Sequence, residues 1–331
     1  MNVHELPMIL FTVIGQMSVG AFWALGAIHL YGYSKKMAPE TVDQVTNTAM
    51  YAAGPLLVLG FFAAFFHLGD PFNALNTLRH IGSSWQSREI ASGILYGASG
   101  FTFAFSQWFG LFTRTIRQAL AGLTAIAGFL LVLTMAGTYY SVETIPAWHH
   151  PATWIFFFGS ALLTGSLAVG VALLVTWNMQ ARQAGGWLYQ LASRFHLISD
   201  QPMNDELNRL TTKALQGISL SSSLAGVTLL VTYPIYFLYL AGGPAAAQEV
   251  ADRLIMPASY IRLALLAVVV ILAGVFAFVR ARNDTTPSRN LAIIISSAFT
   301  LAVVTELLGR GMHYEGLWHV GLNTAQTLLG H

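Results

Sequence analysis

The sequence predicts an all-α integral membrane protein, a bundle of eight transmembrane helices forming one membrane-anchor domain over residues 1–331. Two features of composition indicate this fold class. Hydrophobic residues make up 55% of the chain and charged residues only 9%, whereas about a quarter of the residues in soluble domains are charged. The mean hydropathy is +0.59. A soluble fold of this length has no core large enough for so much apolar surface, but a bilayer accommodates it.

The third observation is a series of apolar segments, each close to the roughly 20 residues that a helix needs to cross a bilayer. The predicted spans are 6–31, 48–67, 90–113, 118–140, 153–176, 215–242, 258–279 and 291–309. No Lys or Arg precedes the first segment, and it is longer than the apolar region of a signal peptide, so we expect a retained helix. The polar stretch 177–214 is predicted to be a cytoplasmic helical excursion and not a ninth span.

The distribution of Lys and Arg predicts the orientation of the bundle. The connections after the first, third, fifth and seventh spans carry eleven of these residues, whereas the opposite side of the membrane carries five. Cytoplasmic loops are enriched in Lys and Arg. We therefore expect both termini to lie on the non-cytoplasmic side.

The composition also excludes several kinds of cofactor and partner. The chain has no cysteine, so it holds no cysteine-ligated iron–sulfur cluster, no covalently attached haem and no disulfide. The formal net charge of +2 does not indicate nucleic-acid binding. Redox chemistry in this protein therefore needs a carrier bound without thiolates, or cofactors of a partner.

Ionisable residues within or near membrane helices are costly and are candidates for function. The candidates are His67 at the end of the second span, Glu89 at the start of the third, Arg262 in the seventh, and Glu306 and Arg310 around the end of the eighth. The predicted topology places all of them on the non-cytoplasmic face. A histidine, a carboxylate and an apolar surround suit the head group of a lipid-soluble quinone.

Each of these residues also has a structural interpretation. His67 is suited to cap its helix, and Glu89 to favour the dipole of a helix start. Arg310 is suited to anchor its helix at the membrane surface, and Arg262 and Glu306 to form a structural ion pair. The residues alone predict a polar cluster on one membrane face, and they do not name quinone.

Five groups of motifs, spread over nearly the whole chain, resemble the DmsC membrane-anchor subunits of the dimethyl sulfoxide reductase family. In sequence order they are HELP (4–7) with FTVIGQ (11–16), HLGDP (67–71) with NALN (73–76), EIASG (89–93), TIPAW (144–148) and ELLGRG (306–311). The segment 177–214 is longer than the family's usual fifth connection, so the resemblance assigns no functional residue to this segment.

The resemblance implies an anchor that oxidises menaquinol in the bacterial cytoplasmic (inner) membrane. The electrons would pass to a four-cluster iron–sulfur subunit and then to a molybdenum catalytic subunit, both on the non-cytoplasmic face. The positions of His67 and Glu89 match residues of the family's quinol site. The terminal acceptor binds another subunit, so dimethyl sulfoxide, amine N-oxides and selenate remain open.

Two other classes of membrane protein compete with this interpretation. A dihaem cytochrome b anchor needs paired helical histidines, but only His29 and His67 lie in the predicted spans, at opposite faces. A secondary transporter or a proton pump usually has ionisable groups near the bilayer midplane. Here His29 has no carboxylate beside it in the predicted spans. Anchors of the polysulfide-reductase type remain a further alternative.

Overall fold

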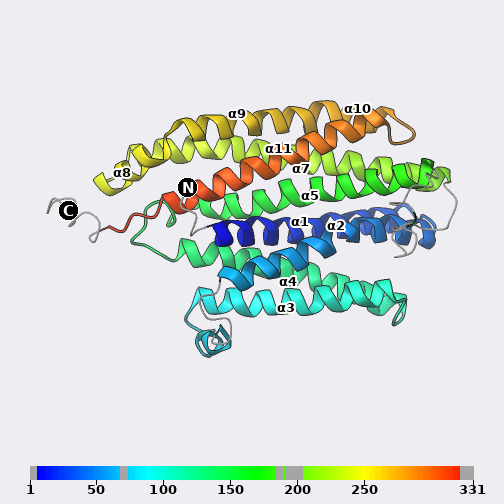
Figure 1. The fold of residues 1–331 in the computed structure, drawn as a ribbon, viewed down its shortest axis with the longest axis horizontal. Coiled ribbons are helices and arrows are strands. Elements are labelled where there is room, and N and C mark those ends of the chain that lie inside the picture. Colours follow the sequence, from blue (N-terminus) through cyan, green and yellow to red (C-terminus); the bar gives the residue numbers. More distant parts are fainter. Residues whose placement is uncertain (1–5, 68–73, 183–189, 191–203, 321–331) are drawn as a thin grey trace.

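The computed structural model describes residues 6–67, 74–182, 190 and 204–320, and the regular structure within these ranges is entirely helical. The long helices run side by side along one axis and form an elongated bundle (Figure 1). In sequence order the elements are α1 (Leu6–Ser34), α2 (Pro39–His67), η2 (Ala74–His80), α3 (Trp85–Trp108), α4 (Arg114–Tyr140), α5 (Ala152–Arg182), α7 (Asp205–Ala241), α8 (Ala245–Leu254), α9 (Pro257–Ile271), the π-helical turn η3 (Leu272–Ala277), α10 (Phe278–Asn283) and α11 (Arg289–Glu315). The predicted all-α class is confirmed.

Seven helical units of the described residues are long and apolar enough to cross a membrane. They are α1, α2, α4, α5, α7, the continuous unit of α9, η3 and α10, and α11. The remaining long helix, α3, has 24 residues but carries more polar side chains, among them Arg88, Glu89 and Gln107. The protein is therefore a multi-pass membrane protein.

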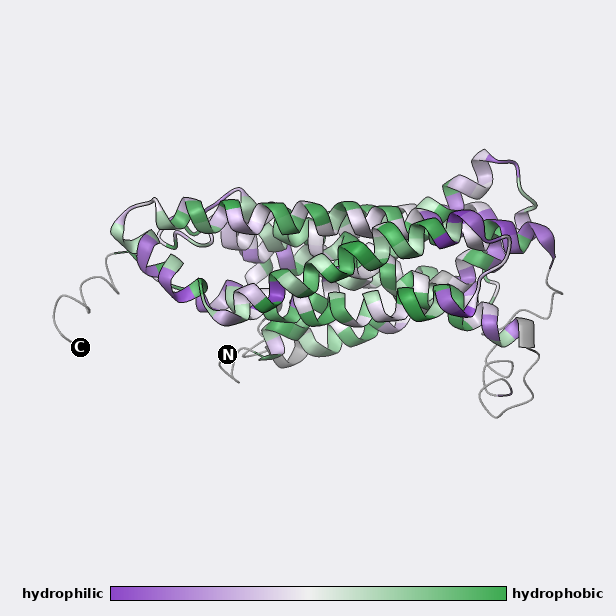
Figure 2. Ribbon diagram, turned by 90° about the horizontal axis from the view of Figure 1, so that it is seen from above, coloured by the Kyte–Doolittle hydropathy of each residue, from purple (hydrophilic) through white to green (hydrophobic). Residues whose placement is uncertain are grey.

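Hydrophobic residues occupy the middle of the helices, and hydrophilic residues gather at the two ends of the bundle (Figure 2). This pattern is the one expected in a bilayer, where apolar side chains face the hydrocarbon region. A helix also satisfies its own backbone hydrogen bonds there. Successive long helices run in opposite directions, and the 141–151 loop joins the end of α4 to the start of α5 (Figure 1). The ends of helices far apart in sequence therefore meet.

Several helices extend beyond the predicted spans. Helix α2 begins at Pro39, nine residues before the predicted limit of 48. The polar excursion 177–214 is shorter than predicted, because α5 continues to Arg182 and α7 already begins at Asp205. Residues 183–189 and 191–203 lie outside the described residues. Apolar windows end where polar residues begin, whereas a helix continues as long as its backbone bonds can form.

The polar start of α7 has specific contacts that explain why it is helical. The side chain of Asn204 caps the helix by accepting a hydrogen bond from the Leu207 amide at 2.7 Å. The Glu206 carboxylate accepts from the Ala38 amide at 3.0 Å and from the Thr41 hydroxyl at 3.1 Å. This extension therefore packs on the α1–α2 connection.

Helix α1 lies at the centre of the bundle and contacts α2, α4, α5 and α11. Its closest approach is to α5. A methyl group added at Gly20 would overlap the backbone carbonyl of Ala161, and one added at Gly165 would overlap the backbone at Gly20. Small residues at these positions allow the two backbones to come together.

We expect Gly20→Ala to destabilise the protein by about 1–3 kcal/mol or more, the range typical of an overpacked core. Unlike a side chain, the Ala161 carbonyl cannot avoid the added methyl group by changing its rotamer. Gly26→Ala is the matched control, since Gly26 lies on the same helix and an added methyl group there has no neighbour within 4 Å. Thermal unfolding in detergent provides the measurement. Equal midpoints for the two variants would contradict this account of the α1–α5 contact.

Candidate functional site

The helix directions bring the predicted site residues to the end of the bundle where α1 begins, called here the N-terminal end (Figure 1). Glu89 lies in the first turns of α3, Arg262 in the first turns of α9, and Glu306 and Arg310 in the last turns of α11. His67 is the last residue of α2 at this end, but its side chain lies outside the described residues. The helix positions of these five residues therefore lie at the same end of the bundle, and the membrane face to which this end belongs stays a prediction.

Arg262 and Glu306 form a buried ion pair between α9 and α11. Arg262 is 1% exposed and Glu306 is 4% exposed, and Arg262 Nη2 lies 3.4 Å from Glu306 Oε1. Arg262 Nε also donates to the Thr305 carbonyl at 2.8 Å, and the guanidinium lies 3.7 Å from the centre of the Tyr233 ring. Gly309 makes room for it, since a methyl group there would overlap the guanidinium. The structural interpretation of this pair is thus supported by direct contact.

Arg310 lies one helical turn beyond Glu306 and is also buried, but its partners are neutral. Its Nη2 donates to Gln16 Oε1 on α1 at 3.1 Å, and its guanidinium lies 3.9 Å from the centre of the Phe157 ring on α5. Among the described residues, no carboxylate lies within ion-pair distance of Arg310. Arg310 therefore connects α1, α5 and α11 and brings into the site a positive charge that has no ion-pair partner among the described residues.

Glu89 is partly buried where α3 meets α4. Its Oε2 accepts a hydrogen bond from the Thr138 hydroxyl of α4 at 2.8 Å. Within the described part of the protein it shares no hydrogen bond with Arg262, Glu306 or Arg310. Glu89 and Arg310 are nevertheless both within electrostatic range of Tyr139. The carboxylate and the buried cation thus both act electrostatically on the same tyrosine.

Three hydroxyl groups form a series beside Arg310. The Thr12 hydroxyl donates to the Met8 carbonyl at 2.6 Å, so it must accept in its 3.0 Å contact with the Tyr314 hydroxyl. Tyr314 therefore donates to Thr12, and its oxygen lies 2.9 Å from the Tyr139 hydroxyl, which is also 3.6 Å from Met8 Sδ. Tyrosines at helix ends usually belong to the interfacial belt, so the sequence did not distinguish this series of hydroxyls.

His313 is a further residue that sequence reasoning missed. The predicted eighth span ended at 309, but α11 continues to Glu315 and includes His313, so the statement that only His29 and His67 lie in spans is wrong. The imidazole stacks on Trp148 at 5.5 Å and meets Tyr139 edge-on at 4.7 Å between ring centres. Its Nε2 is buried and has no hydrogen-bond partner among the described residues.

The 141–151 loop covers this end of the bundle and is held in place by several contacts. Val320 N–H donates to the Thr144 carbonyl at 2.8 Å, and the Tyr236 hydroxyl donates to the Ala147 carbonyl at 3.0 Å. Burial lowers the pKa of the His150 imidazole in the same loop. Burial therefore favours the neutral form of His150.

The match to a protein-family model decides the family. The model described as the DMSO reductase anchor subunit (DmsC) matches residues 1–317. The chain belongs to the DmsC family. The resemblance carried by the five groups of motifs is thereby confirmed.

Curated relatives of this DmsC-family protein include a component of the anaerobic dimethyl sulfoxide reductase of Escherichia coli, which is 33% identical over 175 residues, 52% of this protein and 58% of the relative. The component of the same name from Haemophilus influenzae is 32% identical over 179 residues, 53% and 60% of the two proteins. A component of the sulfite dehydrogenase of Allochromatium vinosum is 29% identical over 145 residues, 40% and 44%. The matches to the first two thus span about three fifths of those relatives.

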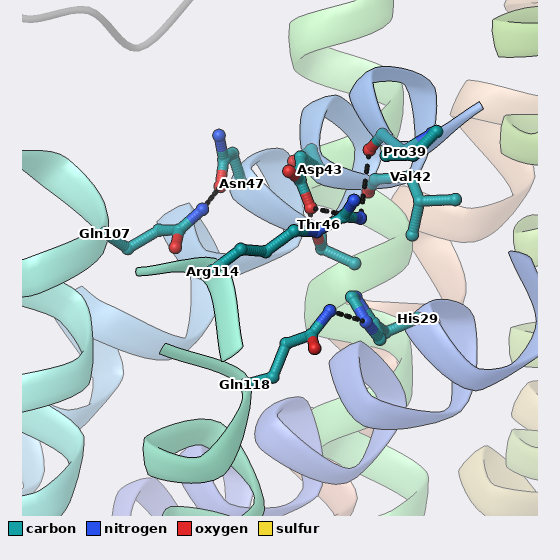
Figure 3. A network of polar contacts seen from close by, with 9 residues as sticks. All are labelled: His29, Pro39, Val42, Asp43, Thr46, Asn47, Gln107, Arg114 and Gln118. Carbon is teal, nitrogen blue, oxygen red and sulfur yellow. Dashed lines mark hydrogen bonds and ion pairs between the residues drawn. The ribbon is translucent and has the colours of Figure 1, made fainter. Parts of the chain in front are cut away.

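The far end of this DmsC-family bundle carries a separate polar network (Figure 3). Arg114 of α4 pairs with Asp43 of α2 at 3.1 Å, and Gln118 of α4 contacts His29 of α1 at 3.1 Å. Asp43 is also within electrostatic range of His29. The expectation that His29 has no carboxylate nearby in the spans is therefore wrong, because α2 begins earlier than its apolar segment. These contacts hold α1, α2 and α4 together.

Proposed function

We propose that this protein is the quinol-oxidising membrane anchor of a molybdenum-containing reductase of the dimethyl sulfoxide reductase type. The observation that carries the proposal is the set of ionisable side chains at the N-terminal end, where Arg262, Glu306 and Arg310 are buried and Glu89 is partly buried in an otherwise apolar bundle. A protein that only anchors soluble subunits to the membrane does not need buried charges inside its helices. Membership of the DmsC family supports the same function.

Menaquinol is the proposed substrate, and its oxidation to menaquinone releases two electrons and two protons. In this proposal Glu89 accepts a proton from a quinol hydroxyl, and His67 forms a hydrogen bond with a quinol oxygen. Thr138 orients the Glu89 carboxylate. Arg262, Glu306 and Arg310 supply the fixed charges around the head group. Because the protein has no cysteine, the electrons must leave to clusters in another subunit.

The partners are proposed to be a four-cluster iron–sulfur subunit and a molybdenum catalytic subunit that dock at the N-terminal end. In this arrangement α3 is the eighth span, paired with α4, and both termini are non-cytoplasmic. The support is the charge distribution: Lys35, Arg117, Lys213, Arg282 and Arg289 all lie at or near the far end. Cytoplasmic ends of membrane helices are enriched in such residues.

The absence of cysteine permits a direct test of orientation with single substitutions. Ser141→Cys places a thiol at the N-terminal end, and Ser34→Cys places one at the far end, and both positions are exposed. In spheroplasts a membrane-impermeant maleimide is expected to label Ser141→Cys at once and Ser34→Cys only after permeabilisation. Labelling in the reverse order would place the N-terminal end in the cytoplasm. Protection of Ser141→Cys when the partner subunits are co-expressed would locate their docking face.

The terminal substrate is set by another subunit, and the relatives differ in this respect, since one is named for dimethyl sulfoxide reductase and another for sulfite dehydrogenase. An anchor of the polysulfide-reductase type and a secondary transporter are the alternative functions. Purification with the partner subunits, followed by mass spectrometry and turnover assays with menaquinol and candidate acceptors, tests the proposal. A purified complex that contains no redox partner would contradict it.

A further inference from the structure

Gln16 is a fully buried glutamine with an unused hydrogen-bond donor. It lies on α1, is 0% exposed, and its Nε2 has no partner among the described residues. The two ends of a glutamine amide are hard to distinguish by shape, but here the chemistry decides. Arginine has only donors, so the atom 3.1 Å from Arg310 Nη2 must be Oε1. The amide nitrogen is therefore the end turned away from Arg310, and neither of its hydrogens has a partner among the described residues.

An unpaired buried amide is unfavourable, and it is more so within a membrane, where water is scarce. The positive charge of the neighbouring Arg310 is unfavourable here for the same reason. Arg262 has a carboxylate partner in Glu306, whereas the buried Arg310 has only Gln16 and the face of the Phe157 ring among the described residues. Among the described residues, the local group thus carries an unpaired amide donor and a positive charge without a carboxylate partner. A bound ligand with an acceptor oxygen would satisfy both residues.

We propose that Gln16 is a binding residue for an oxygen of the quinol head group, to which Nε2 donates a hydrogen bond. This inference rests on the proposed function and assigns a further residue to the same site. Arg310 is a positioning residue in this proposal, because it holds the Gln16 amide by its oxygen and so aims the nitrogen at the ligand. Glu89, which like Arg310 acts electrostatically on Tyr139, remains the proposed proton acceptor.

Two substitutions separate the donor role of Gln16 from its packing. Gln16→Leu removes the amide, and Gln16→Glu keeps the size and the acceptor for Arg310 but removes the donor. The dissociation constant of a fluorescent hydroxyquinoline analogue of quinol, measured on the purified complex, is the readout. Both variants are expected to bind about tenfold more weakly, the loss that corresponds to one hydrogen bond. In turnover assays KM for menaquinol should rise more than kcat falls.

Gln118→Leu is the matched control, because Gln118 is an exposed glutamine in the separate network at the far end (Figure 3). It is expected to bind the analogue as the wild type does. Reduction of substrate by an artificial dye donor and the unfolding midpoint show which variants remain assembled. Binding by Gln16→Glu at the wild-type affinity would overturn the role of Nε2 and leave the proposed function intact. A wild-type complex that does not bind the analogue would remove both.

Discussion

Glu89→Gln is expected to abolish quinol-driven turnover while leaving the complex assembled. A glutamine has the size of glutamate and its Oε1 can still accept from the Thr138 hydroxyl, but it cannot take up a proton. Loss of a general base typically slows a reaction by about 10²–10⁴-fold. His67→Ala is expected to have the same consequence, because a quinol oxygen loses its hydrogen-bond partner. The assay compares menaquinol with an artificial dye as the electron donor, since the dye bypasses the quinol site.

Glu40→Gln is the control for this prediction, because Glu40 is an exposed carboxylate in the first turn of α2 at the far end. It is expected to keep both activities. Equal losses of quinol-driven and dye-driven activity in Glu89→Gln would indicate an assembly defect. Full quinol-driven activity in both Glu89→Gln and His67→Ala would remove this pair from the mechanism.

Glu306→Gln is expected to destabilise the protein by about 3–5 kcal/mol, because it leaves the buried Arg262 guanidinium without its carboxylate. Both side chains are almost fully buried, with exposed fractions of 1% and 5%. The thermal unfolding midpoint in detergent and the yield of assembled complex report the loss. Combining Glu306→Gln with Arg262→Met is expected to recover part of it, because the double variant no longer buries an unpaired charge.

Glu249→Gln is a matched control for the ion pair. Glu249 lies 3.1 Å from Arg253 within α8, but the two side chains are 45% and 44% exposed. Surface pairs of this kind contribute only about 0–1 kcal/mol. The midpoint of Glu249→Gln is therefore expected to stay close to that of the wild type. Equal midpoints for Glu249→Gln and Glu306→Gln would show that the buried pair has no special role in stability.

The helical class and the repeated crossing of the membrane were predictable from local sequence alone. A low content of charged residues together with apolar segments of spanning length leaves few other folds, because only a bilayer accommodates that much apolar surface. The ends of the helices were less predictable. Helix α2 starts at Pro39 and α11 continues to Glu315. Their polar turns contact neighbouring segments, through Thr41 with Glu206 and Tyr314 with Thr12, and hydropathy does not report such contacts.

The candidate residues were also visible in the sequence, since buried charges are rare in membrane helices and few of them are present here. The sequence also suggested the ion pair of Arg262 with Glu306, but it did not show the neutral partners. Gln16 and Arg310 are 294 positions apart in the sequence, and Tyr139 and Tyr314 are 175 apart.

Sequence alone thus determined the class, the family motifs and the residues that carry charge. Tertiary structure decided which charges are paired, because the packing of α1, α5, α9 and α11 sets the neighbours of each side chain. Gly309 admits the Arg262 guanidinium beside Glu306, whereas the same helix turns Arg310 toward a neutral glutamine. Hydrogen-bond partners depend on distances between helices, and these distances follow from side-chain packing across the whole bundle.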